Sequence, residues 1–306
     1  ADVGMLALHA DAGDDLGHAW LSRAEDELPL FAASRQVEFG GIDGRLIDVN
    51  LDGMDDLILA GADLQLHLAT GTESSPFQVA CTAVPRISWP CALTTADYDR
   101  DGSTDVALIA YNEDTSNLSV HAILTEGGRL KVAKKIITIP GPLSLRIGSC
   151  PLSAGLVSSD FDRDGWPDLA INGNDTILLN HLSAGLLADR WFSETPFYVG
   201  FASNRLSGGS AMIAADMNAD TLPDLVYTWG SQRFLVLRNA GRTTPSQFAE
   251  PEFIDTNSFW PVPNNHPRRL SAHDMDADGF EDLVMGPTIE RIIPVHPRER
   301  KLCPAQ

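Results

Sequence analysis

The sequence of 306 residues predicts an all-β fold of repeated units, and two observations lead to that prediction. An acidic motif recurs five times along the chain, and each copy is followed by a short apolar run with strand-like alternation, such as Val106-Ala-Leu-Ile. A unit that recurs in this way indicates stacked supersecondary units. The hydrophobic content of 43% is enough to bury a core, which excludes a disordered acidic tail.

The motif reads Asp, any residue, Asp or Asn, any residue, Asp, usually Gly, any two residues, Asp. We number its residues as positions 1 to 9. The copies are named loop 1 to loop 5 and cover residues 48–56, 97–105, 160–168, 216–224 and 274–282. Their starts are separated by 49, 63, 56 and 58 residues. Positions 1, 3, 5 and 9 together hold 18 of the 42 acidic residues, so the acid is concentrated in the loops.

This spacing predicts a cation site in each loop. Alternate residues of a tight loop point inward, so the side-chain oxygens of positions 1, 3 and 5 converge. Glycine at position 6 allows a sharp turn, position 7 offers its backbone carbonyl, and the carboxylate at position 9 completes the shell. Six or seven hard oxygens in flexible geometry suit Ca²⁺ better than Mg²⁺. The Asp at position 9 and the strand-like flanks distinguish the motif from an EF-hand.

Asp and Gly are also ordinary turn formers, which is the simpler explanation of any one loop. Five copies in one frame favour the cation sites. Loop 4 departs from the motif, because Thr221 stands where the turn prefers Gly. A β-branched residue at positive φ is costly, so loop 4 is the weakest of the predicted sites.

The five loops, their flanking strands and Phe39-Gly40 ahead of loop 1 resemble the FG-GAP or VCBS repeats of the integrin α-subunit β-propeller. The resemblance covers most of the chain. It implies four-stranded antiparallel blades, with calcium in the loop between the first and second strands of each blade. A propeller of such blades also hides most sheet edges.

Carried over position by position, the resemblance implies about five calcium ions held by side chains and by one carbonyl per loop. The side-chain ligands are Asp48, Asn50, Asp52, Asp56, Asp97, Asp99, Asp101, Asp105, Asp160, Asp162, Asp164, Asp168, Asp216, Asn218, Asp220, Asp224, Asp274, Asp276, Asp278 and Asp282. The carbonyl ligands at position 7 are Met54, Ser103, Trp166, Leu222 and Phe280. Five divalent cations would bring the formal charge from −20 to about −10.

The start of the chain predicts an incomplete blade. Asp2 and the residues after it align by eye with Asp105 and its strand, so Asp2 matches position 9 of a sixth loop. We expect strands near 3–9, 17–22 and 29–34 in this blade. In the blade that contains loop 2, we expect strands around 94–96, 105–110, 118–124 and 130–137. Residues 1–306 are expected to form one propeller domain, six blades being favoured over five or seven.

The four cysteines permit two disulfides. Cys81 and Cys91 lie ten residues apart and can pair locally, and Cys150 can pair with Cys303. Disulfides and calcium sites suit an extracellular, periplasmic or cell-surface protein. Four buried free thiols in a cytosolic protein are the alternative.

A recognition surface is expected opposite the calcium loops, where the connections that enter each blade carry arginines and aromatic residues. Its predicted ligand-binding residues are Arg86, Trp89, Arg146, Arg205, Trp260 and Arg268. Arginines and aromatic side chains are enriched in recognition surfaces. The alternative is structural: arginines paired with neighbouring Asp, and Trp packed between blades.

These features favour a non-catalytic, calcium-stabilised adhesion or recognition module with a protein or carbohydrate ligand. A lectin with sugar pockets between blades and an accessory propeller of a secreted enzyme are the alternatives. No catalytic residue is predicted, since the sequence has neither a GxSxG nor an HExxH motif. The net charge of −20 argues against nucleic acid as a partner. The sequence has no apolar run of about 18 residues, so no membrane-spanning segment is predicted.

Overall fold

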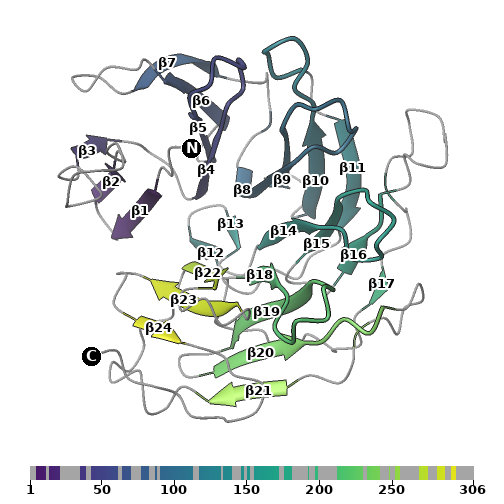
Figure 1. Ribbon diagram of the computed structural model, residues 1–306. Helices are drawn as coiled ribbons and strands as arrows, with labels where there is room; N and C mark the ends of the chain where they lie inside the picture. Colours follow the sequence, from purple (N-terminus) through teal and green to yellow (C-terminus); the bar gives the residue numbers. More distant parts are fainter. Residues whose placement is uncertain are drawn as a thin grey trace. The chain divides into compact units, whose positions relative to one another are not determined.

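The computed structural model shows an all-β chain of small antiparallel sheets (Figure 1). It describes residues 5–11, 14–20, 35–38, 43–60, 64–69, 77–82, 87, 90–112, 117–131, 134–139, 146–147, 150–151, 155–171, 176–180, 192, 197–198, 212–229, 233–241, 248, 252–255, 269–274, 281–286 and 291–293. Every regular element in these ranges is a strand. This part of the chain contains no helix with the length and apolar character needed to span a bilayer.

The chain divides into two compact units, Ala1–Pro142 with Gly148–Cys150, and Leu143–Ile147 with Pro151–Gln306. Each unit is described by itself. The prediction of a single domain over residues 1–306 therefore stays a prediction. Two further strands, β12 (Arg146–Ile147) and β13 (Cys150–Pro151), are short.

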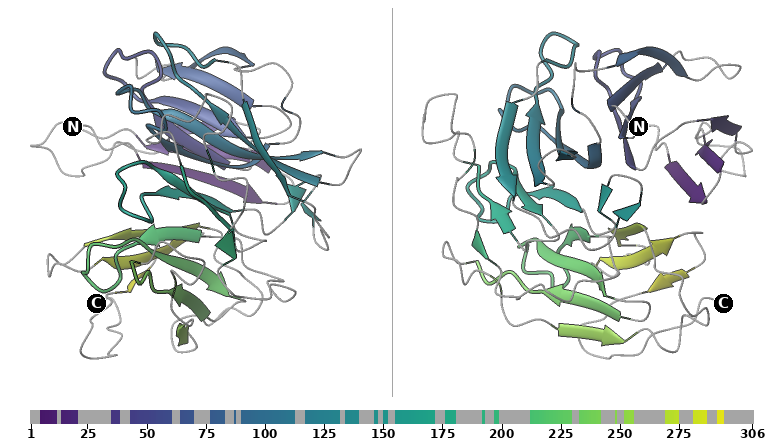
Figure 2. Two further views of the ribbon diagram at one scale, coloured as in Figure 1. Left: turned by 90° about the vertical axis from the view of Figure 1, so that its right-hand side faces the viewer. Right: turned by 180° about the vertical axis from the view of Figure 1, so that it is seen from behind.

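In its described residues, the first unit contains three sheets. The N-terminal sheet has strands β1 (Met5–Asp11), β2 (Asp14–Trp20) and β3 (Arg35–Glu38). The second has β4 (Asp43–Ile47), β5 (Asp56–Ala60), β6 (Leu64–Ala69) and β7 (Phe77–Thr82). The third has β8 (Pro90–Ala96), β9 (Asp105–Asn112), β10 (Asn117–Ile123) and β11 (Lys134–Ile139). Within each sheet the strands lie side by side in chain order (Figure 2).

The described part of the second unit also contains three such sheets. The first of them has β14 (Leu156–Ser159), β15 (Asp168–Ile171), β16 (Thr176–Leu178) and β17 (Phe197–Tyr198). The next has β18 (Met212–Ala215), β19 (Asp224–Trp229), β20 (Arg233–Leu237) and β21 (Glu252–Asp255). The last has β22 (Arg269–His273), β23 (Asp282–Gly286) and β24 (Arg291–Ile293).

The predicted strand positions agree with these sheets, with shifts at the ends. The N-terminal strands begin at Met5 and Asp14, against predictions of 3 and 17, and β3 follows the predicted range 29–34, which lies outside the described residues. The predicted strand 130–137 is divided, because Leu130 closes a bridge to Thr125 through the Gly127-Gly128 turn, while β11 begins at Lys134. Each acidic loop joins the first and second strands of its sheet, as predicted.

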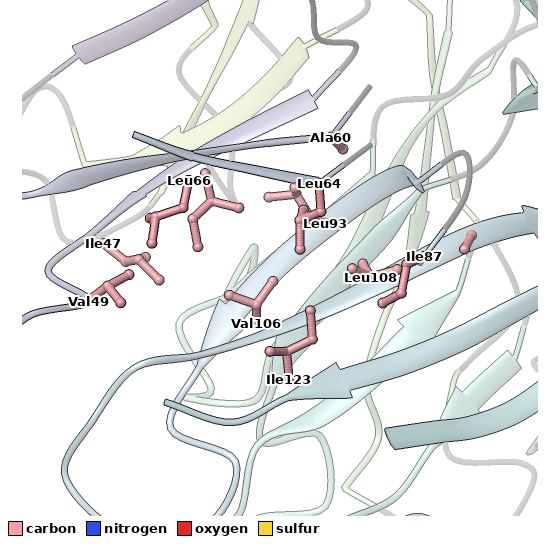
Figure 3. Close-up of a cluster of buried hydrophobic side chains, with 12 residues drawn as sticks. Ile47, Val49, Ala60, Leu64, Leu66, Ile87, Leu93, Val106, Leu108 and Ile123 are labelled. Atoms are coloured by element: carbon pink, nitrogen blue, oxygen red, sulfur yellow. The ribbon is translucent and has the colours of Figure 1, made fainter. Parts of the chain in front are cut away.

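Consecutive sheets whose side chains are described pack face to face, and their second strands β5, β9, β15 and β19 are buried on both faces. In β9 every residue from Asp105 to Tyr111 is buried. Val106, Leu108 and Ala110 pack in one cluster with Ile58, Leu64 and Leu66 of the preceding sheet (Figure 3). In β19, Leu225 and Tyr227 belong to the cluster shared with β15, while Val226 belongs to the cluster shared with β23. Burial on two faces explains why these strands read as almost continuous apolar runs.

The two-sided burial makes a core substitution costly. Leu108 is fully buried between the second and third sheets. Leu108→Ala should lower the free energy of unfolding by about 2–5 kcal/mol, because it leaves a cavity in a packed core. The same substitution at Leu51, which is 60% exposed in loop 1, should change it by no more than about 0.5 kcal/mol. Urea unfolding of both variants measures the difference, and equal effects would contradict the packing described for β9.

Candidate metal centre

The loops fold around their own acidic side chains. The position-1 carboxylate accepts the backbone N–H of position 6 through its Oδ2 atom in all four loops whose turn is described. The N–O distances are 2.8 Å for Gly53 on Asp48, 3.0 Å for Gly102 on Asp97, 2.9 Å for Gly165 on Asp160 and 2.6 Å for Thr221 on Asp216. These bonds close each turn over the position-1 side chain.

Positions 3 and 5 are fixed in the same manner. In loop 2 the Asp101 N–H donates to Asp99 Oδ1 at 3.1 Å, and the Ser103 N–H donates to Asp101 Oδ1 at 2.7 Å. Loops 1, 3 and 4 repeat both contacts. In loops 1 and 4, where position 3 is Asn, its Nδ2 also donates to Oδ2 of position 5, at 2.9 Å in each loop.

The consequence is the convergence that the spacing predicts. Oxygens of Asp97, Asp99 and Asp105 lie within 4.8 Å of one another in loop 2, and so do oxygens of Asp160, Asp162 and Asp164 in loop 3. In loop 3 the Oδ1 atom of Asp160 is buried and has no hydrogen-bond partner. An unpaired buried carboxylate oxygen beside two further carboxylates fits a hard divalent cation.

The position-9 carboxylate has a second function that the spacing did not predict. One of its oxygens accepts the N–H of position 2 of its own loop, as Tyr98 N binds Asp105 Oδ2 at 2.9 Å. The other accepts an N–H at or just beyond the end of the third strand, as Thr125 N binds Asp105 Oδ1 at 2.8 Å. Asp56, Asp168 and Asp224 repeat both contacts. These residues, each at the first position of a second strand, tie the loop to the third strand.

Burial makes these carboxylates hard to ionise in the absence of a cation. Loss of hydration raises the pKa of Asp105 to about 7 and that of Asp168 to about 8, although the N–H donors oppose the change. The carboxylates of Asp99 and Asp101 add to the effect at Asp105, as those of Asp162 and Asp164 do at Asp168. Burial also raises the pKa of Asp56, Asp99 and Asp224.

Two further regularities of the loops were missed by sequence reasoning. Position 2 is apolar in all five copies, and Val49, Tyr98, Phe161 and Met217 are buried beneath their loops. Position 4 is left-handed, with φ between 58° and 61° at Leu51, Arg100, Arg163 and Ala219. The apolar position 2 was visible in the sequence, whereas nothing in the residue types of position 4 indicates its conformation.

Some of the remaining predicted site residues are described by the structure, and others lie outside the described residues. Asp274 and Asp282 lie at the two ends of loop 5, while Asp276, Asp278 and Phe280 lie outside the described residues. Arg86, Trp89, Arg205, Trp260 and Arg268 also lie outside them, and Arg146 is described only as part of β12. The recognition surface therefore stays a prediction.

Two other sequence expectations fall on described residues. Arg45, in β4, donates to Asp43 Oδ1 at 2.7 Å, and such pairing of an arginine with a neighbouring Asp is the structural alternative given above for the arginines. Cys91 is disulfide-bonded. Its pairing with Cys81 and the pairing of Cys150 with Cys303 stay predictions.

The comparisons with known proteins agree with the loop pattern. Residues 48–108 match the FG-GAP-like repeat family. This segment runs from position 1 of loop 1, through β5 to β8 and all of loop 2, into β9, and it confirms the resemblance drawn from the acidic motif. No curated protein sequence matches the chain.

Similar solved structures are distant. The crystal structure of BBS1N in complex with ARL6DN is 9% identical with a TM-score of 0.42, over 88% of this chain and 67% of that one. The Bacillus licheniformis rhamnogalacturonan lyase PL11 is 14% identical with a TM-score of 0.39, over 92% of this chain. The exotype rhamnogalacturonan lyase YesX is 14% identical with a TM-score of 0.38, also over 92% of this chain. The chain spans 57% of the first lyase and 55% of the second.

The left-handed turn at position 6 predicts opposite effects of two substitutions. Gly102 has φ of 92°, and a Cβ added to it would meet no atom within 4 Å, so the cost of Gly102→Ala is confined to the backbone. It should destabilise the protein by about 1–2 kcal/mol. Thr221 has φ of 69°, so Thr221→Gly should stabilise it by about 1 kcal/mol. Chemical unfolding in chelator measures both, and effects of the same sign would refute the backbone explanation.

The raised pKa values predict a pH dependence whose sign changes with calcium. Asp168 binds its proton in the folded state up to about pH 8, against an ordinary pKa of 3.8. With chelator, the folded state therefore binds more protons than the unfolded state, and the melting temperature should fall as the pH rises from about 4 to 8. With calcium it should rise over this range, because the cation needs ionised carboxylates.

Asp168→Asn is the control for this pH dependence, because its side chain does not titrate. The variant should show a weaker dependence of melting temperature on pH in chelator. A melting temperature that rises with pH in chelator would contradict the buried, protonated state of these carboxylates.

Proposed function

We propose that the chain is a calcium-stabilised β-propeller module of the FG-GAP type, favoured to have six blades, that recognises a protein or carbohydrate ligand outside the cell without catalysis. The observation that carries the calcium assignment is the loop 3 cluster. Three carboxylates converge there, and one buried oxygen of Asp160 has no partner. When bound, a calcium ion would supply positive charge at that point and would be coordinated by the converging oxygens.

The propeller arrangement is supported by repetition within each unit. Four-stranded antiparallel sheets follow one another in chain order, and the first strands of consecutive sheets are neighbours, as β4 is to β8 and β14 to β18. Their second strands are buried on both faces. A stack of such sheets leaves few exposed edges when it closes into a ring.

The loops contribute to stability through the order they impose. Each of loops 1 to 4 links the first strand of a sheet to the second through its turn and to the third through the position-9 carboxylate. Calcium bound to these loops stabilises the folded state alone, because the oxygens converge only when the loop is formed. Millimolar extracellular calcium is the concentration at which weaker sites of this kind are filled.

Ligand recognition is supported by the family resemblance and by the arginines and aromatic residues on the connections that enter each blade. A glycan array with the calcium-loaded protein separates the two ligand classes. Repeated binding to one sugar class favours a lectin, and its absence together with capture of a protein ligand favours an adhesion module. A ligand should lose affinity on Arg86→Ala or Trp260→Ala but not on Asp55→Ala, which is an exposed position in loop 1.

Removal of calcium should lower the melting temperature by many degrees, because a ligand of the folded state stabilises that state. Differential scanning calorimetry with EDTA and with about 1 mM calcium, the range of extracellular sites, measures this effect. Asp101→Ala should remove part of the calcium-dependent increase, whereas Asp55→Ala should leave it unchanged. The same melting temperature with EDTA and with calcium would refute the proposed cation sites.

A further inference from the structure

Loop 4 differs from the other described loops in what surrounds its buried position-9 carboxylate. Asp224 is fully buried, and its Oδ1 accepts the Asn239 N–H at 2.7 Å. Its Oδ2 accepts the Met217 N–H at 3.2 Å and also Nη1 of Arg238 at 3.1 Å. The carboxylate therefore has a guanidinium ion as a direct partner in addition to two backbone amides.

The arginine occupies a position that is leucine in the three other loops described in full. The residue before the third-strand amide that binds position 9 is Leu68 for loop 1, Leu124 for loop 2 and Leu179 for loop 3. Leucine cannot neutralise a carboxylate. Among loops 1 to 4, only loop 4 therefore has a positively charged side chain at this position, and that side chain is Arg238.

The turn of loop 4 is also held by residues outside it. Arg163, at position 4 of loop 3, donates through Nη2 to the Asp220 carbonyl at 2.7 Å and contacts Oγ1 of Thr221. Glu281 accepts the N–H of Asp216 at 2.7 Å through its Oε2. These contacts surround the one turn that has a threonine at positive φ where loops 1 to 3 have glycine.

The number of carboxylates separates loop 4 from loops 2 and 3, although not from loop 1. Positions 1, 3, 5 and 9 hold four carboxylates in loop 2 and four in loop 3, but three in loop 4, where position 3 is Asn218, and three in loop 1, where it is Asn50. The amide of Asn218 binds Oδ2 of Asp220 at 2.9 Å. With Arg238 beside Asp224, a divalent cation entering loop 4 would meet less negative charge and a nearby positive one.

We propose that loop 4 is a calcium-independent copy of the repeat, in which the Arg238 guanidinium serves as the internal counter-ion of Asp224 and Arg163 holds the turn. Loop 4 then keeps its conformation without a bound cation, while loops 2 and 3 depend on one. This inference rests on the proposed calcium binding, which it refines by assigning one loop of the five to arginine.

The number of bound calcium ions tests the inference directly. Each variant is equilibrated with calcium and its ions are counted by native mass spectrometry, with equilibrium dialysis against radioactive calcium as the second measurement. Asp101→Ala, in loop 2, should lose one ion per chain relative to the unaltered protein. Asp220→Ala, in loop 4, should lose none. Loss of one ion from each variant overturns the inference about loop 4 and leaves the calcium proposal intact.

Exchange of the arginine gives the complementary result. Arg238→Leu installs the residue of loops 1 to 3, so this variant should gain one calcium ion and should have a lower melting temperature in EDTA, which calcium restores. Arg238→Lys keeps the charge and should bind the original number of ions. Arg129→Leu, at an exposed position in the other unit, is the control for loss of a positive charge.

The two proposals fail in different ways. An unaltered chain that binds no calcium refutes the calcium proposal and the division between the loops together. Calcium binding with an Arg238→Leu variant that neither gains an ion nor loses stability in EDTA overturns the inference alone. If Arg238→Leu does not fold in EDTA but folds with calcium and carries the additional ion, the inference is supported, because the cation then replaces the guanidinium.

Discussion

The architecture depends on a buried aspartate that binds two backbone amides. Asp105 stands at the first residue of β9, accepts the N–H of Tyr98 in its own loop, and accepts the N–H of Thr125 after β10. The same side chain thereby fixes the loop, the second strand and the end of the third. An unpaired buried carboxylate is unstable. Its negative charge must therefore be removed by a proton or balanced by amide donors or a cation.

Loops 2, 3 and 4 show two ways of balancing this charge. In loops 2 and 3 the carboxylates face one another, and the pKa of the position-9 residue rises to about 7 and about 8. These are the loops in which we propose a cation as the counter-ion. In loop 4 burial raises the pKa of Asp224, while the Asn239 amide and the Arg238 guanidinium oppose this change, so Arg238 is a direct counter-ion of the carboxylate. One backbone scaffold thus accommodates two electrostatic solutions, chosen by the residue before the third-strand amide.

Much of the candidate site could be predicted from spacing. Alternation along a tight loop brings positions 1, 3 and 5 together whatever the rest of the chain does, and the motif places a loop between the first two strands of each sheet. The structural role of position 9 could not be predicted this way, because its second amide partner lies 12 to 20 residues further along the chain, as Asn180 does for Asp168 and Thr125 for Asp105. Pairing at that distance depends on how the second and third strands align.

The amino-acid sequence alone establishes the all-β fold, the five acidic loops and their resemblance to FG-GAP repeats, because these follow from local spacing and from apolar runs. Which charged side chains surround each loop is determined by the tertiary structure. Arg163 reaches loop 4 over 57 residues of chain, and Arg238 meets Asp224 only once β19 and β20 have paired. Neither contact has a signature in the nine residues of the loop. The charge of a buried site is set by every side chain packed around it, and those neighbours are chosen by folding.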